Sequence, residues 1–390
     1  MSAIAAVVTD WRPKQALWPN TRLSGRIPEM DGLRGIAILM VATFHFVTAT
    51  GAPHHPLWNM VTSVCSLFWS GVDLFFVLSG FLIAGILMDV KHSESYFRTF
   101  YLRRIHRIFP LYFGWWLLLL IGIMFNVDGR FGIRLFSSEA PIWAYPLFIQ
   151  NNIPLILSKE LPLWMAMSWS LALEEQFYLL LPALVRHLNR TALAVLCGAT
   201  VLASPIYRFL LISHNPSLNA GWPFATTCRL DGLAFGVMIA VAARNECCWQ
   251  WARQHMPLLR ICGVILGLCV VIMTCLSSEP VEMAAWRFTI LEAFYAFLLI
   301  LALINPESWL GWLLRRRILI YFGTVSYAIY LFHQGIRGIL NAVIPTFHPN
   351  ALRSVVLLTG SVIVTMLMAH VSWHTVERRL IRRAYAHYKY

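Results

Sequence analysis

Several ionisable side chains of this sequence lie inside long apolar stretches, where they could take part in chemistry. His45 is the only ionisable residue of the first stretch beyond Arg34, Asp73 lies in the second, and Glu174 lies in the fourth. Imidazole is the usual base near neutral pH, and a carboxylate can orient it. We therefore take His45, Glu174 and Asp73 as candidate catalytic residues. Because charged groups are costly in an apolar medium, pairing between helices is the alternative explanation for each of them.

A further group of ionisable residues shares this setting. It comprises Arg208, Arg229, Asp231, Glu292, His333 and Arg337. We expect Arg229, Asp231 and His333 to support the site. A structural ion pair, for example between Arg229 and Asp231, is the alternative.

Basic residues form a second set of candidates. Arg104 and Arg107 precede Phe109-Pro110, and Arg34 follows Asp31 near the start of the first stretch. Guanidinium groups bind phosphate through two parallel hydrogen bonds, so these three arginines predict a site for a phosphorylated ligand. Taken singly, each is also explained as an anchor of membrane topology.

The spacing of Arg34 and His45 connects the two sets. The residues are 11 positions apart, which is close to three helical turns, so they share one helix face about 16 Å apart. A ligand with anionic groups at one end and a reactive group on a long arm could contact both residues. Coenzyme A has this shape.

The elements that position these residues are predicted to be membrane helices. Of the 390 residues, 58% are hydrophobic and only 13% are charged, about half the usual charged fraction. This composition excludes an ordinary soluble enzyme, a disordered chain and a secreted disulfide scaffold. The net charge of +13 falls in clusters between apolar stretches, which argues against nucleic acid as a partner and favours the lipid bilayer. The eight cysteines lack the spacing typical of metal sites, so we expect no metal.

About 20 apolar residues are needed for a helix to cross a bilayer, and ten segments come close. They are residues 31–50, 66–89, 108–126, 168–186, 191–213, 228–243, 258–276, 287–305, 318–340 and 351–374. Lys and Arg lie at alternate flanks of these segments, which predicts that both termini face the cytoplasm. We expect an all-α polytopic membrane protein with three parts: a cytoplasmic N-terminal arm (1–30), a ten-helix transmembrane domain (31–374) and a cytoplasmic basic tail (375–390).

This orientation places His45, Asp73, Glu174 and the further group from Arg208 to Arg337 in the outer half of the membrane, and His370 is the exception. We therefore expect a polar cavity that opens toward the outside and is lined by these side chains.

A series of sequence blocks, taken in order, resembles the membrane-bound acyltransferase family 3. The blocks are MDGLRGIA (30–37) with His45, FFVLSGFLI (75–83), RRIHRIFP (103–110), WSLALEEQFY (169–178), GTVSY (323–327), YLFH (330–333) and ER (377–378). This family O-acylates bacterial polysaccharides, lipopolysaccharide O-antigens, Nod factors and macrolides. The resemblance implies ten core helices in the bacterial cytoplasmic (inner) membrane. It also implies an inward-facing acyl-CoA donor, usually acetyl-CoA, and a glycan or glycolipid hydroxyl outside as the acceptor.

The resemblance also implies roles for single residues. The Arg-x10-His pattern of the family falls on Arg34 and His45, its Arg-x-x-Arg pattern on Arg104 and Arg107, and its fourth-helix glutamate on Glu174. The arginines would then hold the phosphates of the donor, and its pantetheine arm would enter the helix bundle.

Acyl transfer to an alcohol needs a base and donors for the developing oxyanion. We expect His45 either to deprotonate the hydroxyl or to accept the acyl group itself, and the sequence leaves both routes open. Glu174 would orient His45 or stabilise its imidazolium, and Ser170 or Tyr178 would donate to the oxyanion.

Two other classes of protein remain as alternatives. A secondary transporter would share the polar midplane, but it would be expected to show inverted repeats, and the sequence shows no such symmetry. A non-catalytic membrane component of exopolysaccharide assembly would not require His45.

Overall fold

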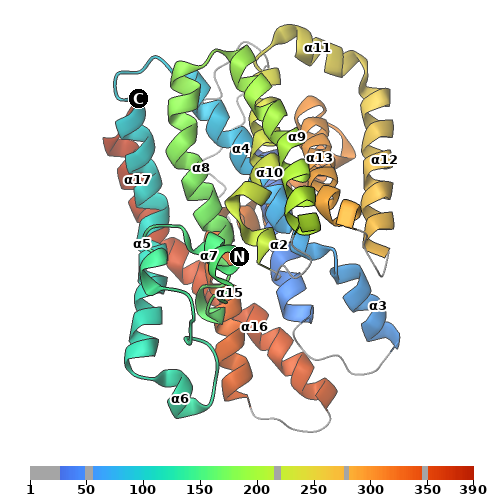
Figure 1. The fold of residues 1–390 in the computed structure, drawn as a ribbon. Coiled ribbons are helices and arrows are strands. Elements are labelled where there is room, and N and C mark those ends of the chain that lie inside the picture. Colours follow the sequence, from blue (N-terminus) through green and yellow to red (C-terminus); the bar gives the residue numbers. More distant parts are fainter. Residues whose placement is uncertain (1–26, 49–55, 215–220, 276–280, 345–349) are drawn as a thin grey trace.

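The computed structural model describes residues 27–48, 56–214, 221–275, 281–344 and 350–390, and these ranges are helical without any β-strand (Figure 1). The predicted all-α class is therefore confirmed within them. Most of the predicted N-terminal arm, residues 1–26, lies outside the described residues.

Ten long helices overlap the ten predicted segments one by one. They are α2 (Pro28–Thr48), α4 (Gly71–Asp89), α5 (Tyr96–Met124), α8 (Ser168–His187), α9 (Arg190–His214), α10 (Leu230–Ala242), α12 (Met256–Cys275), α13 (Val281–Ile304), α15 (Arg317–Val343) and α16 (Asn350–Ser372). Seven helical stretches in the described residues are long and apolar enough to cross a membrane. Helices α8 and α15 are not among the seven, and α10 has only 13 residues. The structure thus supports a membrane protein, and the count of ten spans stays a prediction.

Shorter helices lie between and beyond the long ones. They are α3 (Pro56–Cys65), α6 (Val127–Phe131), α7 (Ile153–Leu157), α11 (Glu246–Gln254), α14 (Trp309–Leu314) and α17 (Arg378–His387). A π-helical turn (Trp373–Glu377) continues α16 into α17, so most of the predicted basic tail is helical. The division of the chain into three parts stays a prediction.

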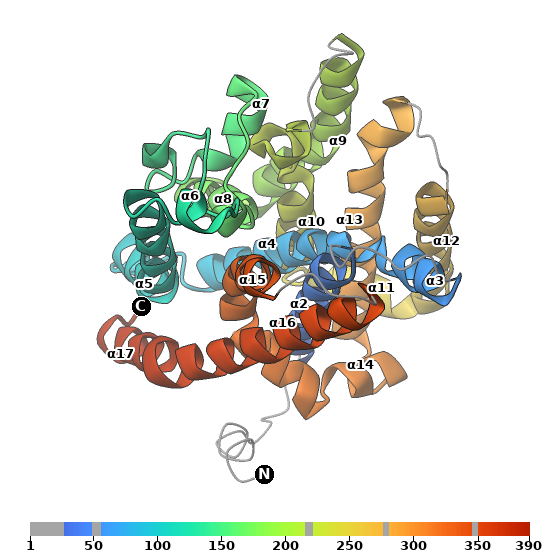
Figure 2. The ribbon, with the colours of Figure 1, turned by 90° about the horizontal axis from the view of Figure 1, so that it is seen from below.

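Helix α2 lies at the centre of the bundle and packs against α15, α4 and α16 (Figure 2). Arg34 contacts Ser326 of α15, and His45, further along α2, contacts His333, further along α15. The two helices are therefore parallel. Because Arg34 and His45 both contact α15, the prediction that they share one face of α2 is confirmed.

Glycines let α2 and α15 approach backbone to backbone. A Cβ atom at Gly35 would collide with the carbonyl oxygen of Leu319, and one at Gly323 would collide with that of Asp31. Small residues at such contacts are typical of helices that pack closely in membranes.

The segment between α5 and α8 folds back against the bundle and holds the start of α8. The Gln150 Nε2 atom donates to the carbonyl and hydroxyl oxygens of Ser168, at 3.0 and 3.1 Å. The Trp115 and Trp164 rings stack 4.0 Å apart, and each indole N–H donates to the other residue's carbonyl oxygen at 2.9 Å. These contacts determine where the α8 side chains face the rest of the bundle.

Near α6, the Asp128 carboxylate accepts hydrogen bonds from the backbone N–H groups of Leu135, Phe136 and Ser137 and from the Ser137 hydroxyl. Burial raises the pKa of Asp128, but these hydrogen bonds outweigh burial and hold it below its ordinary value. The carboxylate thereby stabilises the turn that follows α6.

We predict that Gly35→Ala lowers the stability of the protein by about 1–3 kcal/mol, because the added methyl group forces α2 and α15 apart. The measurement is thermal unfolding in detergent, followed by tryptophan fluorescence. Gly114→Ala on the exposed face of α5 is the matched control, since a Cβ atom there meets no described atom within 4 Å. Equal melting temperatures for the two variants would contradict the close-packing argument.

Candidate active site

A cavity of about 190 Å³ extends along α4 from Val72 to Ile86 and reaches Arg104, Arg107 and Tyr385 at the end of the bundle that is predicted to face the cytoplasm. Its polar lining consists of Arg34, Ser79, Arg104, Arg107, Ser170, Glu174, Tyr178, Ser326, Tyr327, Tyr330 and Tyr385. These residues come from α2, α4, α5, α8, α15 and α17. Six of the eleven predicted site residues therefore meet in one place.

Three arginines give this cavity its positive charge. Arg104 and Arg107 are one helical turn apart on α5, so both face the cavity. Arg34 extends from α2, with its Nη2 atom 3.5 Å from the Ser326 hydroxyl. In the part of the chain that the structure describes, no ion pair joins any of the three to a carboxylate. The cavity thus has the charge and the hydrogen-bond donors to bind an anion.

Glu174 is held inside the cavity wall. One carboxylate oxygen accepts a hydrogen bond from the Ser79 hydroxyl at 2.9 Å, and the other accepts one from the Tyr178 hydroxyl at 2.8 Å. The guanidinium of Arg104 lies 5.0 Å over the Tyr178 ring. Glu174 and Tyr178 therefore stabilise each other and face the arginines.

His45 is paired with His333, on the far side of Tyr330 from the cavity. The His333 Nε2 atom lies 3.3 Å from the Nδ1 atom of His45. His333 is fully buried and His45 is half-buried. The Nη1 atom of Arg337 donates to the His45 carbonyl oxygen at 3.3 Å and so anchors this end of α2.

The neighbours of the two rings determine their protonation. The His333 Nδ1 atom lies 2.8 and 3.1 Å from the carbonyl oxygens of Tyr330 and Ile329, so Nδ1 carries the proton and Nε2 is the acceptor. The His45 Nδ1 atom faces two acceptors, this Nε2 and the Val41 carbonyl oxygen at 2.9 Å, so it also carries a proton. The lone pair of neutral His45 is therefore on Nε2. Such a nitrogen can act as a base or a nucleophile.

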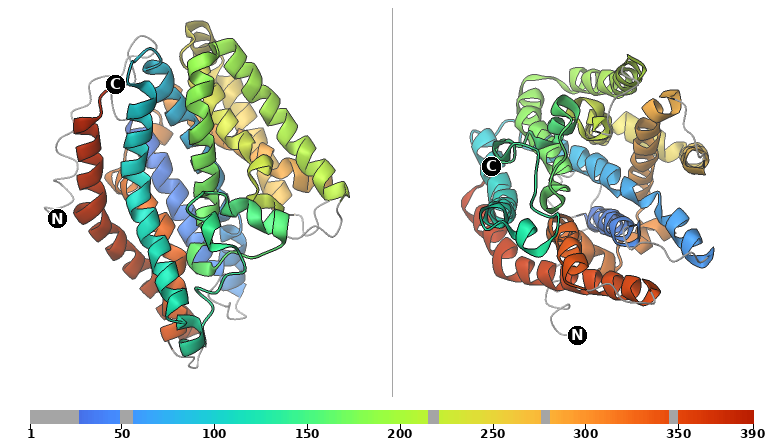
Figure 3. Two further views of the ribbon diagram at one scale, coloured as in Figure 1. Left: turned by 60° about the vertical axis from the view of Figure 1, so that its left-hand side comes forward. Right: turned by 60° about the horizontal axis from the view of Figure 1, so that its bottom comes forward.

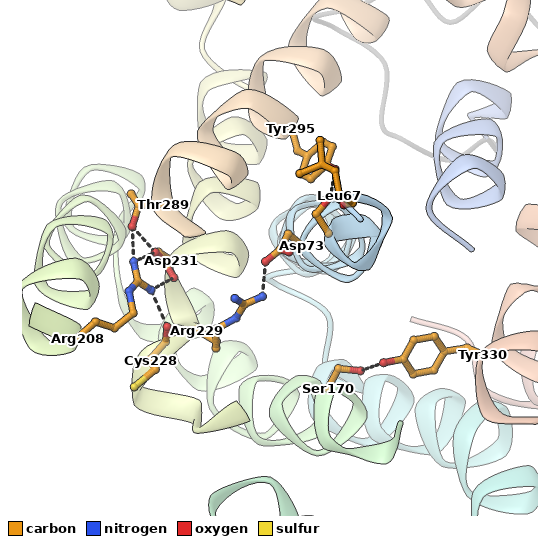
Figure 4. Close-up of polar contacts among 11 residues, drawn as sticks. Leu67, Asp73, Ser170, Arg208, Cys228, Arg229, Asp231, Thr289, Tyr295 and Tyr330 are labelled. Carbon is orange, nitrogen blue, oxygen red and sulfur yellow. Dashed lines mark hydrogen bonds and ion pairs between the residues drawn. The ribbon is translucent and has the colours of Figure 1, made fainter. Parts of the chain in front are cut away.

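Tyr330 connects the cavity to the histidine pair. Its hydroxyl is 2.6 Å from the Ser170 hydroxyl in the cavity wall (Figure 4), and its carbonyl oxygen binds His333. Tyr330 is not among the site residues predicted from the sequence. It lies three positions before His333, and residues at this spacing are neighbours on the surface of a helix, so the spacing could have indicated it.

The contacts of Glu174 differ from the prediction. Glu174 is predicted to orient His45, but in the described residues its hydrogen bonds go to Ser79 and Tyr178, and His333 is the partner of His45. The hydroxyls of Ser170 and Tyr178 are hydrogen-bonded to Tyr330 and Glu174, and their role as oxyanion donors stays a prediction. Tertiary packing determines these hydrogen-bond partners, and the spacing of the residues in the sequence does not reveal them.

Asp73, Arg229 and Asp231 belong to a separate cluster between α4, α9, α10 and α13 (Figure 4). Arg229 forms an ion pair with Asp73. Asp231 pairs with Arg208 at 2.9 Å rather than with Arg229, and it also accepts a hydrogen bond from Thr289. The ion pairing considered as the alternative is thus present, with Arg208 rather than Arg229 as the partner of Asp231. The predicted roles of these residues in the site stay predictions.

These charged side chains do not line an open cavity. Asp73, Arg208, Arg229 and Asp231 are each at most 1% exposed, and Glu292 is fully buried beside them. The expectation of a polar cavity open to the outside is wrong for these five residues. A buried charge is strongly unfavourable unless it is paired, and the pairs Arg208–Asp231 and Arg229–Asp73 meet this requirement. Both carboxylate oxygens of Glu292 lack a hydrogen-bond partner among the described residues.

In the described ranges, no three His, Cys, Asp or Glu side chains are grouped so that they could hold a metal ion. The candidate active site consists of the residues that line the arginine-rich cavity and of the histidine pair.

Comparison with known proteins bears on what such a site does. The family model described as "Acyltransferase domain" matches residues 27–370. "Peptidoglycan O-acetyltransferase OatA" of Listeria monocytogenes is 28% identical over 389 aligned positions, which cover 95% of this chain and 58% of that protein. "Putative peptidoglycan O-acetyltransferase YrhL" of Bacillus subtilis is 27% identical and is covered to 56%. The chain thus spans little more than half the length of these relatives. No solved structure matches.

The buried ion pairs lead to a prediction about stability. Asp231→Leu leaves the Arg208 guanidinium buried without its counter-charge, which typically costs about 3–5 kcal/mol. The double variant Arg208→Met with Asp231→Leu removes both charges and is expected to be more stable than the single variant. Thermal unfolding of the purified proteins in detergent measures both. If the double variant were less stable than Asp231→Leu, the ion pair would stabilise the protein by more than the mutual compensation of two buried charges.

Proposed function

Because the chain belongs to the membrane-bound acyltransferase family 3, we propose that this acyltransferase moves an acyl group, most simply acetyl, from cytoplasmic acyl-CoA to a hydroxyl of a glycan or glycolipid outside. The observation that carries the proposal is the combination of a cavity lined by three arginines with a histidine pair that is hydrogen-bonded to Tyr330 of the cavity lining.

The proposed topology has ten membrane helices, with both termini in the cytoplasm of a bacterium and the chain in its inner membrane. The alternation of basic flanks supports it. The parallel directions of α2 and α15 are also consistent, since the first and ninth of ten spans must run the same way.

The donor is proposed to bind in the cavity at its basic end. Arg34, Arg104 and Arg107 are suited to anionic phosphates, since each can donate two hydrogen bonds in one plane. Apolar side chains such as Phe75, Leu82 and Ile86 line the rest of the cavity and suit the uncharged pantetheine arm. The thioester would then reach the Ser170–Tyr330 pair at the boundary with the histidines.

In the proposed reaction, the Nε2 atom of His45 takes the proton of the acceptor hydroxyl. The hydroxyl oxygen attacks the thioester carbonyl carbon, the carbon–sulfur bond breaks, and the thiolate of CoA leaves and is protonated. His333 accepts the Nδ1–H hydrogen bond of His45 and so stabilises its imidazolium. The Ser170 and Tyr330 hydroxyls are the nearest donors for the carbonyl oxygen as it becomes negative.

A second route uses the same atom. His45 Nε2 attacks the thioester carbonyl carbon first, the carbon–sulfur bond breaks, and the CoA thiolate leaves. The acceptor hydroxyl oxygen then attacks the acyl-imidazole, the carbon–nitrogen bond breaks, and the hydroxyl proton passes through the released Nε2 to the thiolate. Both routes need an unprotonated Nε2, which the hydrogen bonds of Nδ1 provide. The names of the two relatives make peptidoglycan the first acceptor to test.

We predict that His45→Gln inserts normally but transfers acetyl about 10²–10⁴-fold more slowly, because the amide cannot act as a base. His333→Gln should lose less, since it removes only the support of His45. Acetyl groups on the cell-wall glycan, measured by mass spectrometry in a deletion strain, report activity. His370→Gln is the control, because His370 contacts Tyr321 away from the site. Substantial acetylation by correctly inserted His45→Gln would overturn the mechanism.

A second prediction concerns the donor. Arg104→Ala or Arg107→Ala each removes a charge-assisted hydrogen bond of about 1.5–3 kcal/mol, so KM for acetyl-CoA should rise about 10- to 100-fold. Initial rates of CoA release by the purified protein in proteoliposomes measure this. Arg98→Ala is the matched control, because Arg98 lies exposed on the same helix outside the cavity. An unchanged KM in the double arginine variant would return both residues to the role of topology anchors.

A further inference from the structure

Helix α17 lies against the cytoplasmic part of α5, although the sequence suggests only a basic tail. Figure 3 shows α17 (red) beside α5 (teal), and Figure 1 shows the same arrangement. The π-helical turn Trp373–Glu377 precedes α17, and Glu377 in this turn is buried with a hydrogen bond from the Ser372 hydroxyl at 2.9 Å. Single π turns often occur at functional sites.

The residues after α17 are fastened to α5 through backbone carbonyl groups. The Nε and Nη2 atoms of Arg103 donate to the Tyr388 carbonyl oxygen at 2.9 and 2.6 Å. The Ser95 and Thr99 hydroxyls donate to the carbonyl oxygen of Lys389 at 2.8 and 3.1 Å. Arg103 therefore serves this contact, whereas its neighbours Arg104 and Arg107 line the cavity.

This attachment brings Tyr385 of α17 into the cavity lining, next to Arg104 and Arg107. One face of its ring is covered by the Arg103 guanidinium, 4.2 Å from the ring centroid. The residue is nevertheless 50% exposed. Tyr385 is thus an exposed aromatic residue in the lining of a positively charged cavity.

The size of the cavity decides what meets this surface. Pockets that enclose a drug-sized ligand usually measure about 300–1,000 Å³, and this cavity has only about 190 Å³. This volume suits the narrow arm of an acyl-CoA better than the whole molecule. An acyl-CoA with its arm in the cavity would have its adenosine end nearest the exposed part of the lining, where Tyr385 lies.

We propose that Tyr385 stacks on the adenine base of the donor, so that α17 forms the outer wall of the nucleotide subsite. The inference rests on the proposed acyl-CoA donor. A ring that already has a guanidinium on one face is well placed to take a flat base on the other, as aromatic side chains do in nucleotide-binding proteins. The C-terminal helix is then part of the binding site.

The test compares two ligands that differ only in the nucleotide. Binding of CoA and of 4′-phosphopantetheine, which lacks the adenosine portion, is measured by calorimetry on the full protein in detergent. Tyr385→Ala should weaken CoA binding about 5- to 100-fold, the range found when stacked aromatics are removed, and leave phosphopantetheine binding unchanged. Tyr385→Phe keeps the ring and should bind CoA as the wild type does. Tyr207→Ala, another part-exposed tyrosine, on α9, is the matched control.

The outcomes separate this inference from the proposed function. If Tyr385→Ala binds CoA as tightly as the wild type, or weakens both ligands equally, the stacking role is wrong. If CoA binds with the expected pattern but no acetyl group is transferred, the stacking role stands and the proposed activity fails. If the wild type binds neither ligand, both the stacking role and the proposed acyl-CoA donor are wrong.

Discussion

The contact between α2 and α15 is the constraint on which the candidate site depends. Two parallel helices approach so closely that glycine is required on each, and no side chain can lie between their backbones at Gly35 and Gly323. This contact determines the register, and the register places Arg34 beside Ser326 and His45 beside His333. A shift by one residue would turn His45 by about 100° around its helix, since an α-helix has 3.6 residues per turn. The positions of the charged cavity and of the histidine pair thus both follow from the packing of α2 against α15.

The buried ion pairs constrain a different part of the bundle. The ion pairs of Asp73 with Arg229 and of Asp231 with Arg208 connect α4, α9 and α10 where water is absent. Such pairs add little net stability, because desolvation offsets most of the attraction, but an unpaired charge at the same place would be strongly unfavourable. They therefore act mainly by excluding other arrangements of these helices. The arginines of the cavity differ in this respect, because no described carboxylate forms an ion pair with them, and this makes them available to a ligand.

The sequence predicted those features that depend on local periodicity. The apolar segments match the long helices, the 11-residue spacing put Arg34 and His45 on one face, and the spacing of Arg104 and Arg107 put both in the cavity. It could not predict partners that packing selects. Glu174 and His45 are both polar residues of apolar helices, and nothing in their spacing shows that Ser79 and His333 are nearer. For the same reason, the sequence could not distinguish Arg208 from Arg229 as the partner of Asp231.

The C-terminal residues show what an argument from composition leaves out. Basic residues in α17 agree with the rule that positive charge stays in the cytoplasm, and this rule fully accounts for the arginines. It says nothing about Tyr385, whose position depends on the π-helical turn and on the Arg103 contacts with the carbonyl oxygen of Tyr388. The Arg103 guanidinium covers one face of the ring and the residue stays half exposed, and both depend on the contact of α17 with α5. A helix that anchors topology needs only its charge, whereas one that lines a binding site needs a defined register, and the fastening of residues 388 and 389 to α5 supplies that register.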